Sequence, residues 1–123
     1  MEIRRAMPVV KTDDPEATRA FYVDFLGFRV AMEQEGMLML ASETTPTTQV
    51  LVAWESETAM DPHVLEVDIS VEVPNADAAL AEAEARGLEI VYPIRDEPWG
   101  IRRFFVKDGS GRTINIAQHY DPS

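Results

Sequence analysis

The sequence contains no cysteine among its 123 residues. This absence excludes disulfide bonds, a cysteine nucleophile and any metal site that uses a cysteine sulfur. The sequence also has no apolar run near the roughly 18 residues that a membrane span needs. Its start, MEIRRAMPVV, has two arginines but not the apolar segment of a signal peptide. We therefore expect a cytoplasmic protein that has no membrane partner.

Positive charge is scarce, because 11 basic residues stand against 22 acidic residues and leave a net charge of −11. A field of this sign repels polyanions, so nucleic acid is not an expected partner. The excess of acid has two interpretations: it keeps the protein in solution, or it attracts a cationic ligand. The apolar fraction of 46% is ordinary and is sufficient for one core, which predicts a single domain over residues 1–123.

The first half of the chain combines one helix signal with four strand-like segments. In TDDPEATRAFYVDFLGF, Asp14 suits an N-cap, Pro15 suits the first helical position and Gly27 suits the stop. Steps of three and four residues predict a core-facing stripe made of Ala17, Ala20, Phe21 and Phe25. The strand-like segments are Ile3–Val10, Phe28–Glu33, Met37–Ala41 and Thr47–Trp54.

The second half repeats this order. In NADAALAEAEARG, Asn75 suits an N-cap and Gly87 suits a terminator, and this glycine lies 87 − 27 = 60 residues after the first one. The helix stripe consists of Ala76, Ala79, Leu80 and Ala83. The strand-like segments are Leu65–Val73, Leu88–Tyr92, Ile101–Val106 and Arg112–Gln118. A turn at Asp108–Gly111 joins the last two.

This repetition predicts an α+β fold of two βαβββ modules, at about residues 1–56 and about residues 63–120. The helix of each module covers one face of its sheet. We expect the other face to curl, so that the two curved sheets form a cleft lined by side chains of one strand parity. In the last strand, that parity places Thr113, Asn115 and Ala117 together.

Four stretches, in order, resemble the vicinal oxygen chelate superfamily of glyoxalase I, bleomycin resistance proteins, fosfomycin resistance enzymes and extradiol dioxygenases. DPEATRAFYVDFLGF is similar to its opening motif, and VEVPNADAALAEAEARG is similar to its second helix. PWG is similar to the loop before its seventh strand, and KDGSGRTINI is similar to its ending. The resemblance spans nearly the whole chain and implies the glyoxalase/bleomycin resistance fold, with a ligand site in the cleft. It also implies a homodimer.

The metal enzymes of this superfamily place four ligands in the cleft, typically His or Gln, Glu, His and Glu. Carried over by resemblance, these positions fall on Met7, on Gln49 or Leu51, on Asp68 and on Asn115. Divalent metals favour imidazole and carboxylate ligands, and this set keeps one carboxylate and no histidine. His63 and His119 lie at strand ends, where a solvated or capping role is expected. We therefore predict no metal and no cofactor.

Without a metal, the cleft is interpreted as a binding site for a small molecule. A mainly apolar lining with a few polar groups is typical of such sites. Trp99, and also Trp54, have two interpretations, because each either closes over a flat ligand or packs a loop or an interface. The methionines are either core residues or ligand contacts. The expected lining is Met7, Val9, Met37, Met39, Gln49, Leu51, Asp68, Ser70 and Asn115, with Trp99 at the edge.

Two functions remain open at this point. The first is metal-independent binding that sequesters a cationic, antibiotic-like ligand, the behaviour that resemblance to the bleomycin resistance branch implies. The second is a metal-dependent lyase, isomerase or dioxygenase of the same superfamily, whose ligand positions lie in a different register. Metal-free acid–base chemistry by Asp68 with a neighbouring arginine is a third possibility.

Overall fold

The computed structural model describes residues 1–120, and the chain divides into two compact units. The first unit is Met7–Glu66, and the second unit joins Met1–Ala6 to the chain from Val67 onward. Residues 1–6 therefore pack with the second half of the sequence. There the Arg4 amide donates to the Glu72 carbonyl over 2.9 Å, and the Arg5 guanidinium pairs with the Glu72 carboxylate at 2.6 Å.

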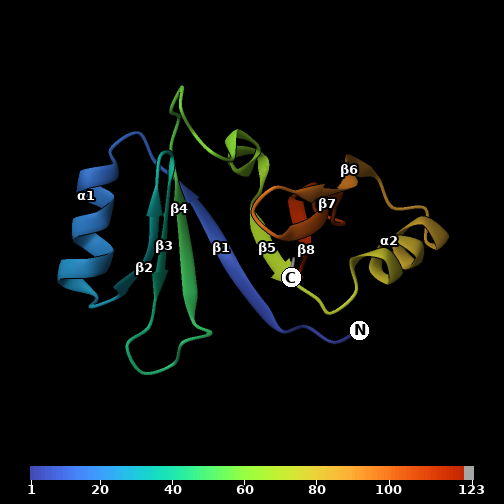
Figure 1. Cartoon of the computed structure of the whole chain (residues 1–123), viewed down its shortest axis with the longest axis horizontal. Helices are drawn as coiled ribbons and strands as arrows, with labels where there is room; N and C mark the ends of the chain where they lie inside the picture. The colour runs from blue at the N-terminus through green and yellow to red at the C-terminus, as the bar shows by residue number, and fades with distance from the viewer. Residues whose placement is uncertain (121–123) are drawn as a thin grey trace. The chain divides into compact units, whose positions relative to one another are not determined.

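The first unit contains a four-stranded sheet in the order β2-β3-β4-β1 (Figure 1). β1 and β4 are parallel, whereas β3 is antiparallel to both of its neighbours. The helical segment after β1 covers one face of the sheet, over a core that is built on Leu38, Leu40 and Val52. The elements are β1 (Arg5–Lys11), α1 (Pro15–Arg19), the π-helix η1 (Ala20–Phe25), β2 (Arg29–Gln34), β3 (Met37–Ala41), β4 (Gln49–Ala53) and the 3₁₀-helix η2 (Pro62–Glu66).

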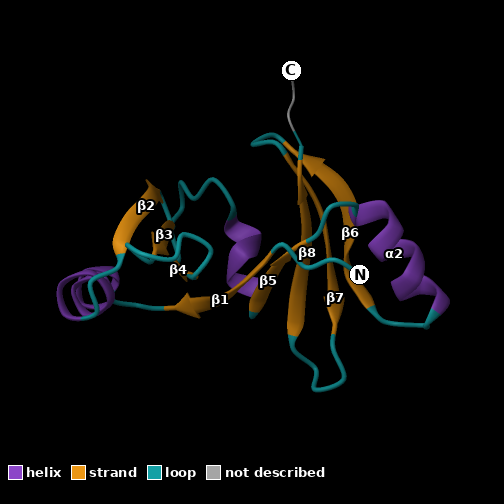
Figure 2. Ribbon diagram, turned by 90° about the horizontal axis from the view of Figure 1, so that it is seen from below, coloured by secondary structure: helices purple, strands orange, loops and turns teal. Residues whose placement is uncertain are grey.

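The second unit has the same plan, with a sheet in the order β5-β8-β7-β6. β5 and β8 are parallel, and β7 is antiparallel to both β8 and β6. Helix α2 covers one face of this sheet (Figure 2), over a core of Val73, Ala79, Ala83, Phe104 and Val106. The elements are β5 (Ile69–Glu72), α2 (Ala76–Ala85), β6 (Ile90–Glu97), β7 (Ile101–Lys107) and β8 (Thr113–His119).

The predicted α+β fold with two βαβββ repeats is confirmed, and β3 has the predicted limits. The strand predicted over Leu65–Val73 is wrong in its first half, because η2 occupies residues up to Glu66 and β5 begins only at Ile69. Pro62 starts η2, since its fixed φ suits a first helical turn. The strand predicted over Leu88–Tyr92 runs further, because β6 stays paired with β7 as far as Glu97.

Both helix starts are confirmed. The Asp14 carboxylate accepts the Ala17 amide over 3.1 Å, and the Asn75 side chain accepts the Ala78 amide over 3.0 Å. Each is an N-cap that satisfies a backbone donor left free at a helix start. Both predicted stops, Gly27 and Gly87, have a positive φ, which glycine adopts without steric cost.

The stripe predicted on the first helix is wrong. Ala17, Ala20, Phe21 and Phe25 are exposed. Tyr22 and Val23 pack against the sheet in their place. The reason is η1, whose wider winding joins the Leu26 amide to the Phe21 carbonyl over 3.1 Å, a step of five residues. The prediction assumed an α-helix of 3.6 residues per turn, and the π-helix changes which side chains share a face.

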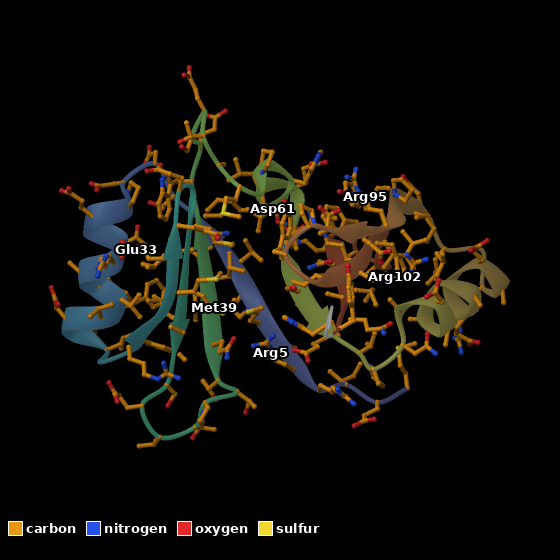
Figure 3. The ribbon with its side chains drawn as sticks, viewed as in Figure 1. Arg5, Glu33, Met39, Asp61, Arg95 and Arg102 are labelled. Carbon is orange, nitrogen blue, oxygen red and sulfur yellow. The ribbon has the colours of Figure 1, made fainter. Side chains whose placement is uncertain are left out.

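The predicted stripe of α2 is confirmed, since Ala76, Ala79 and Ala83 are buried and Leu80 packs on the same core. Because three of these residues are alanines, the helix leaves a cavity of about 620 Å³ above the sheet. Arg102 of β7 ties the helix to the sheet (Figure 3). Its guanidinium lies 2.9 Å from the Asp77 carboxylate of α2 and 3.1 Å from the Asp96 carboxylate of β6. The helices within residues 1–120 are too short and too polar to span a bilayer.

Candidate functional site

A row of side chains crosses the helix-free face of the second unit, which we define as the sheet face opposite α2. Ile114 and Ile116 pack on the helix side of β8, so the alternate residue Asn115 projects to the helix-free face. Ser70 of β5 and Phe105 of β7 are its direct neighbours across the sheet. The predicted site residues Ser70 and Asn115 therefore lie together.

Asn115 has an unsatisfied acceptor at the centre of this row. Its side-chain nitrogen donates to the Ser70 hydroxyl over 2.9 Å. Its Oδ1 is buried and has no hydrogen-bond partner among the described residues. The residue as a whole is 9% exposed, so little solvent reaches this oxygen. A buried acceptor without a partner costs about 1–3 kcal/mol. An N–H or O–H group of a ligand would remove this cost.

An arginine lies among aromatic rings beside the row. The rings of Tyr92 and Phe105 are stacked with centroids 4.3 Å apart. The Arg103 guanidinium carbon lies 5.0 Å from the Phe105 centroid and 5.3 Å from each of the Tyr92 and Trp99 centroids. These distances are within the range of cation–π attraction. We call Tyr92, Glu97, Trp99, Arg103 and Phe105 the arginine–aromatic cluster.

Glu97 holds this cluster together. Its carboxylate accepts the Tyr92 hydroxyl over 2.8 Å and lies 3.0 Å from Nε of Arg95 and 3.8 Å from Nε of Arg103. Burial raises the pKa of the Tyr92 phenol, and the hydrogen bond to Glu97 raises this pKa further. The phenol therefore stays protonated as a donor, and it fixes the ring wall beside Asn115.

The sequence prediction did not include Tyr92, Glu97, Arg103 or Phe105. A signal for two of them was present in the turn at Asp108–Gly111. A tight turn fixes the pairing of the strands on either side. The loop that sets the pairing is one residue longer than this turn, since Lys107 pairs with Thr113. Counting outward from residues 108–112 places Phe105 opposite Asn115 and Arg103 opposite Ala117, as observed. Tyr92 and Glu97 were harder to find, because β6 has two register shifts against β7.

Asp68 was predicted on the fifth strand but precedes it. Its Oδ2 accepts the Thr113 amide over 2.9 Å, and its own amide donates to the Thr113 carbonyl over 2.8 Å. Asp68 therefore fixes the start of β8. This contact weakens the expectation that its carboxylate is reserved for a cationic ligand.

The remaining predicted site residues lie on the helix-free face of the first unit, which we define as the sheet face opposite α1 and η1. Val9 and Met39 flank Leu51 on paired strands. Met39 is labelled in Figure 3. Met7 and Gln49 lie two residues before Val9 and Leu51 on their strands, and so on the same face. The side-chain nitrogen of Gln49 donates to the Pro46 carbonyl over 2.8 Å. This face is mainly apolar, and Met37 extends it along β3.

The predicted cleft residues are thus divided between two sheets. Met7, Val9, Met39, Gln49 and Leu51 share the face in the first unit, whereas Ser70, Asn115 and Trp99 belong to the site in the second. That the two faces line one cleft stays a prediction. Trp54 is half-buried and packs against the core cluster of Leu38, Leu40 and Val52.

Both histidines have acidic neighbours. Nδ1 of His63 lies 2.7 Å from the Glu66 carboxylate on η2, where both side chains are about half exposed. Nε2 of His119, in the last residue of β8, lies 3.7 Å from the Glu72 carboxylate and 3.1 Å from a guanidinium nitrogen of Arg5. These exposed contacts agree with the predicted solvated role.

The residues at the four ligand positions do not fit a divalent metal. Met7 offers a thioether, and Gln49 and Asn115 offer neutral amides whose nitrogens are already bonded to protein oxygens. Asp68 is the single carboxylate, and one of its oxygens accepts a backbone amide. Within residues 1–120, no three His, Cys, Asp or Glu side chains gather closely enough to hold a metal ion. Hard divalent ions need more anionic or imidazole ligands than this.

A family model of the Glyoxalase/Bleomycin resistance protein/Dioxygenase superfamily matches residues 6–116. The chain belongs to this superfamily. The match covers the superfamily as a whole and does not distinguish its bleomycin resistance branch from the other branches. Among the curated proteins, none matches the sequence.

Solved structures of the superfamily fold cover nearly the whole chain. Methylmalonyl-CoA epimerase from Mycobacterium tuberculosis is 18% identical, with a TM-score of 0.71 over 97% of this chain and 88% of that one. A methylmalonyl-CoA epimerase from Streptomyces coelicolor is 19% identical, with a TM-score of 0.71 over 98% and 100%. A superfamily member from Vibrio splendidus 12B01 is 18% identical, with a TM-score of 0.62 over 95% and 99%. At these identities the likeness shows a shared fold.

Proposed function

We propose that this superfamily member binds a small molecule without a metal ion, with Asn115 as the central contact. The observation that carries the proposal is the buried Oδ1 of Asn115, which has no hydrogen-bond partner among the described residues. Native proteins leave few buried polar atoms unsatisfied, and those that remain call for an explanation. A ligand donor explains this one.

The neighbouring groups indicate what kind of ligand fits. Trp99 is half-buried and offers a ring surface at the edge of the cluster, whereas the rings of Phe105 and Tyr92 are buried behind it. The Ser70 hydroxyl lies beside the Asn115 amide. A flat or partly aromatic molecule with an N–H or O–H donor matches this combination. The net charge of −11 favours a cationic molecule over an anionic one at long range.

Sequestration of a cationic, antibiotic-like molecule is therefore the role we propose, as in the bleomycin resistance branch of the superfamily. A sequestering protein must bind the antibiotic tightly and keep it away from its target, and it needs no catalytic group to do so. The resulting phenotype would be resistance to that antibiotic. The donor set at the four ligand positions supports metal independence, because it holds one carboxylate and no imidazole.

Substitution of the amide tests this proposal. Asn115→Leu keeps a similar volume and removes the unpaired acceptor, so we expect the free energy of unfolding to stay level or rise. Binding of a cationic glycopeptide such as bleomycin, measured by calorimetry, should weaken by about 1–3 kcal/mol, roughly 5- to 150-fold in Kd. Asn75→Ser is the matched control, since it removes an amide from the same unit and keeps a capping oxygen.

Two results would contradict the proposal. If Asn115→Leu lowers the stability by several kcal/mol and leaves ligand binding unchanged, Asn115 is a structural residue. If no cationic ligand raises the unfolding temperature of the unmodified protein, sequestration of that class is wrong.

Metal analysis of protein purified without chelator separates this function from the alternative. We expect substoichiometric nickel, zinc, iron and manganese, and no change in ligand affinity after treatment with a chelator. Stoichiometric metal that is lost in Asn115→Leu would instead support a metal-dependent lyase, isomerase or dioxygenase.

A further inference from the structure

The second unit has a cavity of about 620 Å³ between α2 and the sheet, which we call the helix-side cavity. Small-molecule sites in proteins usually have volumes of about 300–1,000 Å³. Voids larger than a water molecule are few in a close-packed interior, so a hollow of this size is not ordinary core packing. Asn115 projects to the opposite face of the same sheet, so the helix-side cavity is separate from the ligand site proposed above.

The walls of the helix-side cavity are apolar. Ala79 and Ala83 of α2 form one wall, and their short side chains leave open the space that larger residues would occupy. The facing wall belongs to the sheet and consists of Val73, Phe104, Val106 and Ile116. Water inside such walls finds few hydrogen-bond partners, so an apolar molecule that displaces it gains free energy.

The polar side chains that line the helix-side cavity are exposed and lie at its mouth. Glu82 and Arg86 pair with each other at 2.7 Å, one turn apart on α2. The side-chain oxygen of Asn75 accepts the Ala78 amide over 3.0 Å. Together with Glu2, the charged side chains at the mouth sum to −2 + 1 = −1. Neither this charge nor the net charge of −11 favours an anionic ligand.

We propose that the helix-side cavity binds an uncharged, apolar small molecule. The walls offer carbon surface, and the charges at the mouth are of both signs and partly paired with each other. Met1 and Leu88 also line the cavity and are 76% and 44% exposed, so a bound molecule would cover part of this apolar surface. The start of the chain runs beside α2 in both Figure 1 and Figure 2, which places Met1 at the mouth.

Titration with Nile red tests the proposal. This dye is uncharged, its fluorescence rises in apolar surroundings, and it has no N–H or O–H group to offer Asn115. We expect saturable binding of one dye molecule per chain. Ala83→Leu should raise the Kd about tenfold or more, because the added side chain occupies the helix-side cavity. Ala81→Leu is the matched control, since Ala81 is an exposed residue of α2 outside the cavity lining, and it should bind the dye like the unmodified protein.

A second variant keeps the test independent of core packing. Ala78 lines the mouth and is exposed, so Ala78→Phe should obstruct the cavity and weaken dye binding several-fold at an unchanged unfolding temperature. Octanol should displace the dye at a lower concentration than octanoate, which has the same chain length and a negative charge. The reverse order would show that the ligand class is wrong.

The helix-free face supplies the control that separates this site from the proposed function. Asn115→Leu should leave Nile red binding unchanged, whatever it does to the binding of a cationic ligand. Dye binding that is lost in Asn115→Leu and kept in Ala83→Leu would place the dye on the helix-free face and overturn the proposal. Absence of saturable binding, or equal affinities for Ala78→Phe and the unmodified protein, would overturn it as well.

Discussion

Tyr92 shows how burial sets the chemistry of a single side chain. Its hydroxyl donates to a carboxylate, and its ring stacks on Phe105, so the neutral phenol is the form that the fold favours. Burial, and then the carboxylate of Glu97, raise the pKa of this phenol above its ordinary value. At the pH of a cell, Tyr92 is therefore a donor and not a charge.

The raised pKa of Tyr92 predicts that the folded protein loses stability at alkaline pH. An unfolded tyrosine ionises near pH 10, whereas Tyr92 in the folded protein holds its proton to higher pH. Its contribution to stability is thus complete below about pH 10 and is lost as the pH rises toward the folded pKa. Unfolding in denaturant at a series of alkaline pH values should show this fall, and Tyr92→Phe should reduce it. An identical pH profile in Tyr92→Phe would refute the assignment.

Single residues were predicted well where strand parity alone decides their position. Ser70 and Asn115 are neighbours on one sheet face because both strands are regular there. Asp68 was misplaced because a 3₁₀ turn ends just before it, and alternation in LEVDISVEV does not reveal that turn. The unpaired oxygen of Asn115 depends on packing in three dimensions, which the sequence does not encode locally.

At the scale of elements, the turn between β2 and β3 depends on one glycine. Gly36 has a φ of +84°, and a Cβ atom at this position would lie 2.9 Å from the Ala59 side chain and 3.3 Å from the Trp54 carbonyl. Gly27, at the end of the first helical segment, has the same φ but open space around it. A comparison of the two glycines therefore distinguishes the cost of backbone strain from the cost of steric crowding.

Alanine substitutions at these two glycines should differ in cost. Gly27→Ala should lower the free energy of unfolding by about 1–2 kcal/mol, the cost of the left-handed conformation. Gly36→Ala carries the same cost and should lose a further 1–3 kcal/mol or so, because the added methyl group crowds a packed loop. Equilibrium denaturation in urea measures both. Equal losses would mean that the loop at Ala59 adjusts freely.

Caps and stops of elements were predictable because they rest on local chemistry, whereas the helix type was not. Asp14, Pro15 and Gly27 lie where the sequence placed them. The winding between them was read as an α-helix, and the choice of Tyr22 and Val23 as core residues depends on contact with a sheet formed later in the chain. A helical period taken from the sequence cannot anticipate that contact.

For the whole molecule, the excess of acidic residues dominates the long-range electrostatic interactions. Self-repulsion within a compact chain of net charge −11 lowers its stability, and added salt screens it. Raising the ionic strength from low to physiological should therefore raise the unfolding temperature, by about 4 °C for each kcal/mol of repulsion removed. Potassium chloride and tetramethylammonium chloride should act alike. A rise with only one of them would indicate specific ion binding instead of screening.

The overall architecture was the most predictable level, because two repeats of one order of elements constrain each other. The superfamily followed from four motifs in the right order, and the match over residues 6–116 confirms it. The ligand and the reaction, if any, do not follow from these motifs. They depend on which few side chains meet on the helix-free faces, where this chain departs from the metal-binding pattern.

Residues 1–6 belong to the unit formed by the end of the chain, and this has a consequence for synthesis on the ribosome. Met7–Glu66 is continuous, so it can fold as soon as those residues have emerged. The other unit is split, and its opening segment must wait until the closing strand at Thr113–His119 has been made. Residues 1–6 are thus made well before the partners with which they pack, a delay that the length of the intervening chain imposes.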